Sequence, residues 1–402
     1  MHVLRLVRRG ARFLPELWRR ARPAPAARHV VIAGGARHLY VHLPFCASRC
    51  GYCDFVTVVG RTGEHGRYVT ALLHELRLER GLLAPEPDSV YLGGGTPTLT
   101  RADELERLLG ALPAARELTI EANPETVTAE LAALLARNGV DRVSIGAQSF
   151  HMHLLDVLER RSGPESVRRA VHRLRDAGID NISIDLVYGI PGQEPAHLER
   201  DLAEALALEP EHLSAYELEA KPGTRFTHAH GDELRRQADA MESYFERVVE
   251  TLTAAGYRWY ETASFCRRPG LAGGRDLRAR HNLGYWLGHD YLGIGVGAVS
   301  TIENRRWRNA PSLARYLAAL AGDERPPREV EMLSPQVRAS ERLMLGLRLD
   351  EPLLLDGLED ALDEPEVDRL ADAGLVVRDG GTIALTSRGR FLGGGVTARL
   401  LA

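Results

Sequence analysis

Short β-rich runs alternate with helical patterns from residue 38 onward, and no other feature of the sequence constrains the fold as much. Six strands alternating with helices predict a parallel sheet with right-handed crossovers, and a repeat of about 25–35 residues suits an α/β fold, a partial (β/α)6 barrel of the TIM type. Such barrels carry their functional residues at the carboxyl ends of the strands. The expected strands lie near 38–43, 88–92, 117–121, 140–147, 181–188 and 212–218. The expected helices lie between them, at 64–83, 100–112, 128–138, 151–160, 164–177 and 196–208.

Three of the four cysteines lie directly after the first expected strand, as Cys46, Cys50 and Cys53. Thiolate ligands favour zinc or iron–sulfur centres. Three thiolates do not complete a tetrahedral zinc site, and no nearby C-x2-C or H-x3-H pair supplies the missing ligand. On a four-iron cluster, three thiolates leave one iron open to a substrate or cofactor. The spacing therefore favours a 4Fe-4S cluster over a set of incidental buried thiols.

The spacing C-x3-C-x2-C, with Tyr52 before the third cysteine, resembles the radical S-adenosylmethionine (radical SAM) superfamily. The resemblance implies that the three cysteines hold a 4Fe-4S cluster and that S-adenosylmethionine binds the open iron through its amino and carboxylate groups. In that superfamily, reduction of the bound S-adenosylmethionine yields a 5′-deoxyadenosyl radical.

Polar residues stand where the expected strands end. The strand at 88–92 runs into the segment Gly93-Gly94-Gly95-Thr96-Pro97-Thr98, whose glycines would let backbone amides approach a ligand closely. Later strand ends carry Glu121, Gln148 and Asp185, which can hydrogen-bond ribose hydroxyls and an amine. Taken singly, each is as readily a solvated strand-end side chain. Their joint agreement indicates a ligand site at one end of the barrel.

Together, these motifs resemble the oxygen-independent coproporphyrinogen III oxidase family over about residues 38–400. The resemblance implies contacts to S-adenosylmethionine from the strand ends and from the arginine twelve residues after Gln148. The residues concerned are Tyr40, Gly94, Gly95, Thr96, Glu121, Gln148, Arg160 and Asp185.

Residue 55 separates two branches of that family. The decarboxylating oxidases have a further cysteine two residues after the third, where this chain has Phe55. With Phe55, and with an H-N-x-x-Y-W motif at residues 281–286, the chain resembles the heme chaperone branch, HemW. The resemblance implies a heme-related role for His281, Tyr285 and Trp286. On chemistry alone, an axial imidazole beside flat aromatic surfaces competes with a structural histidine whose nitrogens are satisfied internally.

The N-terminal segment differs from the rest of the chain. Residues 1–28 carry eight arginines and one acid. As a helix, residues 3–20 would place arginines on one face and apolar side chains on the other, which is typical of peripheral contact with an anionic membrane surface. A disordered basic tail and an upstream stretch included by a misplaced start codon are the alternatives.

The C-terminal region changes character after two prolines at 326–327. A long helix is expected earlier, at 232–255, and further helices at 335–347, 351–360 and 365–373. A β-hairpin with a Gly-Gly turn follows at 375–386. Helices followed by a hairpin resemble a small winged-helix module. The acid-rich stretch 350–372 and the net charge of −4 argue against nucleic-acid binding.

The sequence therefore predicts four segments: a basic extension and linker (1–37), a radical SAM core barrel (38–265), a heme-motif and connecting region (266–328) and a winged-helix-like domain (329–402). Clustered cysteines and no long apolar run favour the cytoplasm. The expected function is a heme chaperone that binds a 4Fe-4S cluster, S-adenosylmethionine and heme, and passes heme to acceptor hemoproteins such as respiratory cytochromes; a homodimer is compatible with the sequence. Two alternatives stay open, an oxygen-independent coproporphyrinogen III oxidase and a radical SAM methyltransferase, and with them the question whether the protein is an enzyme.

Overall fold

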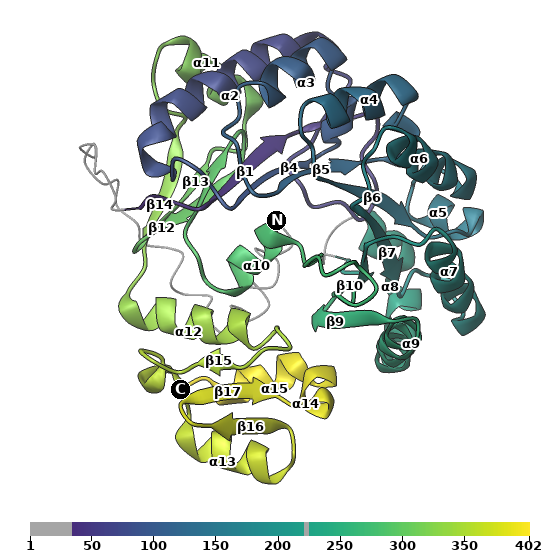
Figure 1. Ribbon diagram of the computed structural model, residues 1–402, viewed down its shortest axis with the longest axis vertical. Coiled ribbons are helices and arrows are strands. Elements are labelled where there is room, and N and C mark those ends of the chain that lie inside the picture. Colours follow the sequence, from purple (N-terminus) through teal and green to yellow (C-terminus); the bar gives the residue numbers. More distant parts are fainter. Residues whose placement is uncertain (1–33, 221–224) are drawn as a thin grey trace.

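The computed structural model describes residues 34–220 and 225–402, so the amphipathic segment expected at 3–20 lies outside the described residues. The six expected strands are confirmed, and they pair in parallel in chain order (Figure 1). The expected partial barrel is confirmed with them. The strands are β1 (His38–Leu43), β4 (Ser89–Gly94), β5 (Leu118–Ala122), β6 (Arg142–Gln148), β7 (Ile182–Tyr188) and β8 (His212–Glu217).

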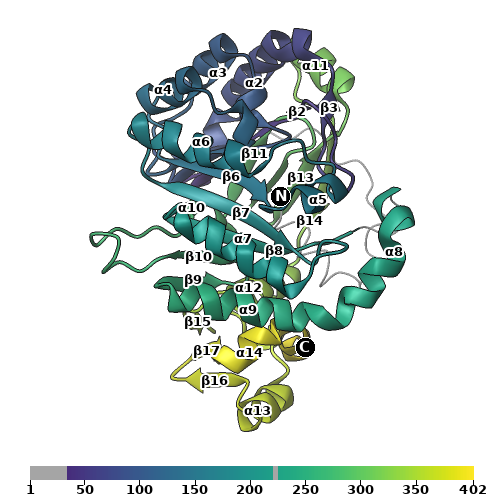
Figure 2. The ribbon, with the colours of Figure 1, turned by 90° about the vertical axis from the view of Figure 1, so that its right-hand side faces the viewer.

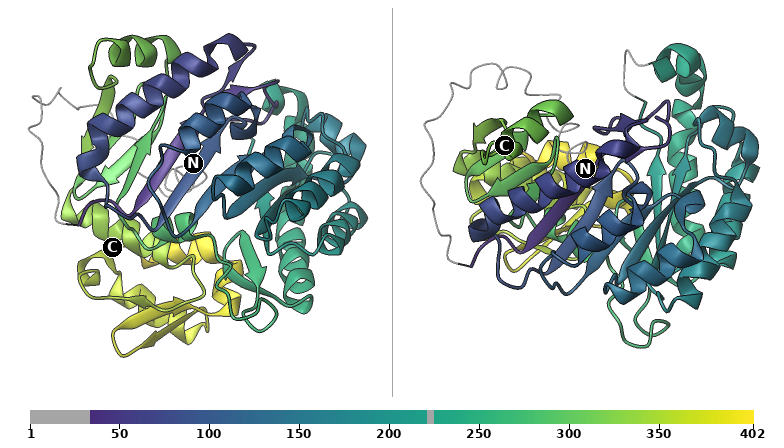
Figure 3. Two further views of the ribbon diagram at one scale, coloured as in Figure 1. Left: turned by 45° about the horizontal axis from the view of Figure 1, so that its top comes forward. Right: turned by 90° about the horizontal axis from the view of Figure 1, so that it is seen from above.

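The helices between these strands form an outer layer around the sheet, which is clear when the molecule is seen from above (Figure 3). Each lies within a few residues of its expected position. They are α2 (His65–Glu79), α3 (Ala102–Leu109), α4 (Ala129–Arg137), α5 (Met152–Val157), α6 (Pro164–Asp176) and α7 (Pro195–Ala207).

Side-chain alternation along the strands explains both the core and the lumen of the barrel. Successive side chains of a strand point to opposite faces. In β7, Ile182, Ile184 and Leu186 belong to the main hydrophobic core, whereas Ser183 and Asp185 line the interior cavity. The strands β5, β6 and β8 repeat the pattern. The barrel therefore has an apolar outer face against the helices and a polar lumen.

The sheet extends beyond the expected barrel on both sides, to twelve strands in the order β14-β13-β12-β11-β1-β4-β5-β6-β7-β8-β10-β9. The strand β11 (Tyr291–Ile294) pairs in parallel with β1, and the strands outside it and outside β8 are antiparallel. Residues 291–309 thus continue the barrel sheet, and the segment boundary expected at 265 falls inside β10. The added antiparallel strands are β9 (Tyr257–Glu261), β10 (Ser264–Arg267), β12 (Val299–Ile302), β13 (Arg305–Asn309) and β14 (Arg328–Met332).

Two expected helices are wrong in part. The single helix at 232–255 is divided into α8 (Arg225–Gln237) and α9 (Met241–Ala254) by a 3-10 turn at Ala238–Ala240. The helix at 351–360 is absent: Leu353–Leu354 form β15, which pairs with a later strand, and Glu359–Ala361 form a 3-10 turn. Pairing of two leucines with the C-terminal sheet outweighs their helix propensity.

The C-terminal unit has a hydrophobic core of its own and packs below the barrel (Figure 2). The expected hairpin is confirmed, with Gly380 and Gly381 both at positive φ in its turn. The strands β15, β17 and β16 form its three-stranded sheet. Its other elements are α12 (Pro335–Gly346), α13 (Glu364–Asp372), β16 (Val376–Asp379), β17 (Thr382–Leu385), α14 (Ser387–Phe391) and α15 (Gly393–Leu400).

Two shorter helices complete the barrel region. The helix α10 (Arg280–Trp286) contacts both β4 and α12, and so lies between the barrel and the C-terminal unit. The helix α11 (Leu313–Ala321) packs on α2. No helix within the described ranges 34–220 and 225–402 has the length and apolar character needed to span a membrane.

Candidate functional site

The lumen of the barrel contains a cavity of about 240 Å³. Every candidate residue from the sequence contributes to its lining, although these residues are up to 246 positions apart in the chain. They are Tyr40, Cys46, Cys50, Cys53, Gly94, Gly95, Thr96, Glu121, Gln148, Arg160, Asp185, His281, Tyr285 and Trp286.

The three clustered cysteines lie in the segment that follows β1. A pair of short parallel strands fixes the base of this segment. The strands of this pair are β2 (Phe45–Cys46) and β3 (Val58–Val59). None of the three forms a disulfide bond with a described residue, and all three are partly exposed. Thr96 Oγ1 donates to Cys46 Sγ at 3.7 Å, and Arg160 Nη1 donates to Cys50 Sγ at 3.9 Å. Burial raises the pKa of the Cys46 thiol to about 11, so a bound cation has to displace its proton.

These thiols fit an iron–sulfur cluster better than a single metal ion. Within the described part of the chain, no three His, Cys, Asp or Glu side chains are gathered closely enough to hold one ion. The thiolates of a four-iron cluster each bind a different iron, so their sulfurs stand apart around the cluster. Three cysteines that share one cavity wall, with no fourth cysteine beside them, match that requirement.

The glycines after β4 pack against the cysteine loop. Gly95 N donates to Leu43 O at 2.8 Å, and Gly94 N donates to Glu121 Oε2 at 3.0 Å. A Cβ on Gly95 would stand 2.5 Å from Pro44 O, and Gly94 has a φ of +125°. The amides of Gly94 and Gly95 thus have hydrogen-bond partners within the protein in this structure, and their approach to a ligand stays a prediction. The glycines are needed for close contact between two loops.

Two buried carboxyl groups face the lumen. Glu121 accepts from Tyr91 Oη at 2.8 Å as well as from the Gly94 amide. Ser144 Oγ donates to Asp185 Oδ2 at 3.0 Å, whereas Asp185 Oδ1 is buried without a hydrogen-bond partner among the described residues. Burial raises the pKa of both groups, that of Asp185 to about 6. An unpaired buried oxygen aimed into a cavity suits a ligand that donates a hydrogen bond.

Asn123 connects the cysteine loop to the strand ends, and the sequence reasoning did not select it. Its Nδ2 donates to Thr96 Oγ1 at 3.2 Å, and its Oδ1 accepts from Arg160 Nη2 at 2.9 Å. It therefore joins the two side chains that each contact a cysteine. Asn123 follows directly after β5, so the rule that selected Glu121 could have found it.

Gln148 has a φ of +67° at a bulge of β6, which turns its side chain over Gly146.

The H-N-x-x-Y-W motif closes the opposite end of the lumen, where the strands begin. His281 is 2% exposed and both of its ring nitrogens are occupied. Its Nδ1 hydrogen-bonds Ser89 Oγ at 2.9 Å, and its Nε2 hydrogen-bonds Tyr285 Oη at 3.0 Å. Burial lowers the pKa of His281 well below its usual range. In this conformation His281 is a satisfied structural histidine, the alternative weighed from the sequence.

A chain of hydrogen bonds continues from this motif to the outside of the barrel. Ser89 Oγ also hydrogen-bonds His38 Nδ1 at 2.8 Å, and His38 Nε2 hydrogen-bonds His289 Nδ1 at 3.1 Å. The rings of His38 and His289 are stacked. Trp286 carries the Arg348 guanidinium over its ring, 4.4 Å from the centroid. The motif thus fixes the barrel floor and links it to the C-terminal unit.

Comparisons with known proteins agree with this architecture. The family model of the radical SAM superfamily matches residues 40–205, and that of the HemN C-terminal domain matches residues 333–392. A solved structure of coproporphyrinogen III oxidase (HemN) from Escherichia coli, a radical SAM enzyme, superposes with a TM-score of 0.74 at 24% identity, covering 91% of this chain and 90% of that one. This likeness shows the fold.

Sequence relatives identify the family. The heme chaperone HemW of Mycobacterium tuberculosis (strain H37Rv) is 36% identical over 375 residues, which is 90% of this chain and 94% of that protein. The heme chaperone HemW of Lactococcus lactis is 32% identical over 377 residues, 90% of this chain and 96% of that protein. The chain therefore belongs to the HemW heme chaperone family of the radical SAM superfamily.

Proposed function

We propose that this protein is a heme chaperone that holds a 4Fe-4S cluster and S-adenosylmethionine and delivers heme to acceptor hemoproteins. The observation that carries the proposal is the identity of 36% with a heme chaperone over nearly the whole of both chains. Phe55 supports it, because it stands where the decarboxylating oxidases have a further cysteine.

In this proposal the cluster binds Cys46, Cys50 and Cys53, and Arg160 and Thr96 stabilise their thiolates through hydrogen bonds. A bound cluster supplies one-electron chemistry and an open iron for S-adenosylmethionine. Asp185 accepts a hydrogen bond from that ligand with its unpaired Oδ1, and Tyr40, Glu121 and Gln148 line the same cavity. Gly94, Gly95 and Thr96 shape the wall beside them.

Respiratory cytochromes are the proposed acceptors, reached from the cytoplasm with peripheral membrane contact through residues 3–20. The basic and apolar residues of that segment support this destination. Removal of residues 1–33 should lower the membrane-bound fraction of the protein in cells, as measured by fractionation. An unchanged fraction would remove the segment from the proposal.

The experiment that tests the function combines heme titration with a turnover assay on the anaerobically reconstituted full chain. We expect saturable one-to-one heme binding with a Soret band and no conversion of coproporphyrinogen III. A matched Phe55→Cys variant should also fail to convert it, since decarboxylation needs more than one added thiol. The absence of specific heme binding would overturn the chaperone function, and conversion by the wild-type protein would identify an oxidase instead.

A further inference from the structure

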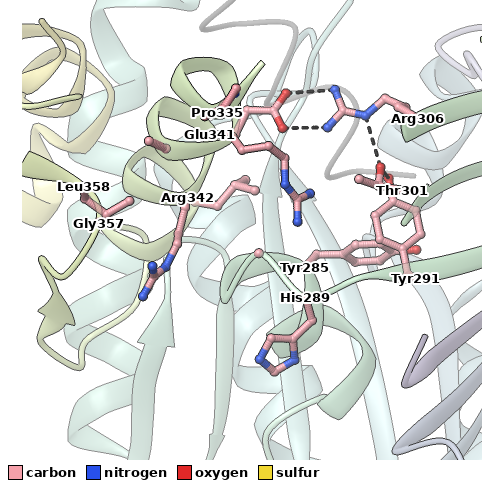
Figure 4. Close-up of a pocket in the computed structure, with 14 residues that line it drawn as sticks. Tyr285, His289, Tyr291, Thr301, Arg306, Pro335, Glu341, Arg342, Gly357 and Leu358 are labelled. Atoms are coloured by element: carbon pink, nitrogen blue, oxygen red, sulfur yellow. Dashed lines mark hydrogen bonds and ion pairs between the residues drawn. The ribbon is translucent and has the colours of Figure 1, made fainter. Parts of the chain in front are cut away.

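A second cavity, of about 290 Å³, lies between the barrel floor and the C-terminal unit (Figure 4). Tyr285, His289 and Tyr291 line it from the barrel side, and side chains of α12 line it from the other side. Arg306 of β13 closes one wall through a two-armed ion pair with Glu341 of α12, at 2.8 and 2.6 Å. The cavity is thus built from both structural units.

His289 is the histidine of this cavity, and one of its nitrogens is available. Its Nδ1 is bonded to His38, but its Nε2 makes no hydrogen bond with any described residue and is not buried. His281, in contrast, has both nitrogens bonded inside the barrel floor. A neutral imidazole with one nitrogen fixed by a hydrogen bond and the other free is the usual form of a metal ligand.

An arginine without a carboxylate partner lies beside this histidine. Two of the three cavity arginines are paired, Arg306 with Glu341 and Arg338 with Asp290. Arg342 forms no ion pair within the described ranges and donates only to the Asp356 carbonyl, at 3.2 Å. Its stem packs against Gly288, where a Cβ would lie 3.6 Å from Arg342 Cγ. The stem of Arg342 therefore lies next to the residue that precedes His289, and its guanidinium has no carboxylate partner in the described ranges.

We propose that heme binds in this cavity, with His289 Nε2 as axial ligand of the iron and Arg342 as partner of a propionate. The inference rests on the proposed heme chaperone function and names the site for it. Guanidinium and carboxylate form two-armed charge-assisted hydrogen bonds. Tyr285, Tyr291, Leu345 and Leu358 supply aromatic and apolar contact surface for a macrocycle.

This assignment gives the H-N-x-x-Y-W motif a positioning role. Tyr285 lines both cavities. On the lumen side, His281 Nε2 hydrogen-bonds the Tyr285 hydroxyl at 3.0 Å. His281 also reaches His289 through Ser89 and His38. A change at His281 would therefore weaken heme binding indirectly, whereas a change at His289 would remove the ligand itself.

Heme titration of the full-length, anaerobically reconstituted protein with optical and resonance Raman spectroscopy tests the proposal. His289→Ala should weaken binding at least about tenfold and remove the imidazole-ligand signature. His281→Ala should keep that signature, and His172→Ala, an exposed histidine on α6, should behave as wild type. Added imidazole should restore the signature to His289→Gly, which separates loss of the ligand from loss of the fold.

A second comparison addresses the propionate. Arg342→Gln should bind heme several-fold more weakly than the wild type does. Both proteins should bind heme dimethyl ester, which has no free propionate, with the same affinity. Loss of the imidazole signature in His281→Ala with its retention in His289→Ala would overturn the assignment and leave the chaperone function intact. Wild-type protein that binds no heme would overturn the proposed function, and the site would fall with it.

Discussion

Two carboxyl groups, Glu121 and Asp185, share the barrel lumen, and neither has a cation paired with it among the described residues. Asp185 illustrates the consequence. Its pKa rises from 3.8 to about 6 in the folded protein because burial disfavours the charged form. Stability contributed by the neutral carboxyl is fully present below the unfolded pKa and is lost as the pH rises through about 6.

Asp185→Asn should therefore stabilise the cluster-free protein in a pH-dependent way. Each unit of pKa shift is worth about 1.4 kcal/mol, so the gain should approach about 3 kcal/mol at pH 8 and be about half that at pH 5. Urea unfolding at the two pH values measures it. Asp368→Asn, at an exposed carboxylate, is the control and should change little. A gain that is equal at both pH values would contradict the account.

Single residues were predictable from the sequence where a strand end placed them. Glu121, Gln148 and Asp185 all line the lumen as their positions indicated. The state of His281 was not predictable, because its partners Ser89 and Tyr285 are fixed by the packing of α10 on β4. No local pattern tells an occupied imidazole from a free one.

At the scale of elements, Gly284 of α10 stabilises the packing of its helix, although glycine usually destabilises a helix. Glycine inside a helix usually costs about 1 kcal/mol relative to alanine. Gly284, however, faces β1 so closely that a Cβ would stand 2.4 Å from His38 Nε2. The close approach is what lets His38 reach His289, which follows α10.

Gly284→Ala should accordingly destabilise the protein by about 2 kcal/mol, because the added methyl forces α10 away from β1. The matched variant is Gly231→Ala in α8, where the nearest atom is a flexible arginine terminus at 3.6 Å. That variant should be neutral or stabilising. Thermal unfolding of the pair provides the measurement, and equal effects at both glycines would show that the His38 contact is unimportant.

Elements with strong local patterns were predicted well, and tertiary contacts decided the rest. Residues 232–255 are good helix formers, so no local signal marks the break at Ala238–Ala240. The break lies where Gln237 donates to Ile190 O at 3.0 Å and Tyr244 donates to Gln193 O at 2.7 Å. These bonds hold α8 and α9 against the loop after β7.

At the scale of the whole molecule, the barrel sheet and the C-terminal unit have separate cores. A small apolar cluster that includes Trp286 and Leu345, together with polar contacts, connects them. We propose the boundary between them just before α12, since the last strand of the barrel sheet, β14, ends at Met332. Arg348, directly after α12, pairs with Glu261 at the end of β9, where the carboxylate is 1% exposed. The same guanidinium covers Trp286 of the motif.

A double-mutant cycle on this pair measures how tightly the two units are coupled. Arg348→Met should cost about 3 kcal/mol because it leaves a buried carboxylate unpaired. Glu261→Gln should cost less, and the double variant should recover most of the loss. Urea unfolding of the cluster-free protein gives the four values. Strictly additive effects would mean that the pair contributes nothing to docking of the C-terminal unit.

The central claim is that this chain delivers heme rather than transforming a porphyrin, and transfer is its most direct test. The reconstituted protein is loaded with one equivalent of heme and mixed with a heme-free acceptor hemoprotein, and the shift of the Soret band is followed in time. We predict transfer that saturates with acceptor concentration in the wild type. In His289→Ala this saturation should be lost, because heme without its axial ligand dissociates freely. Heme that stays bound, or that reaches the acceptor only at the rate of free dissociation, would contradict the account.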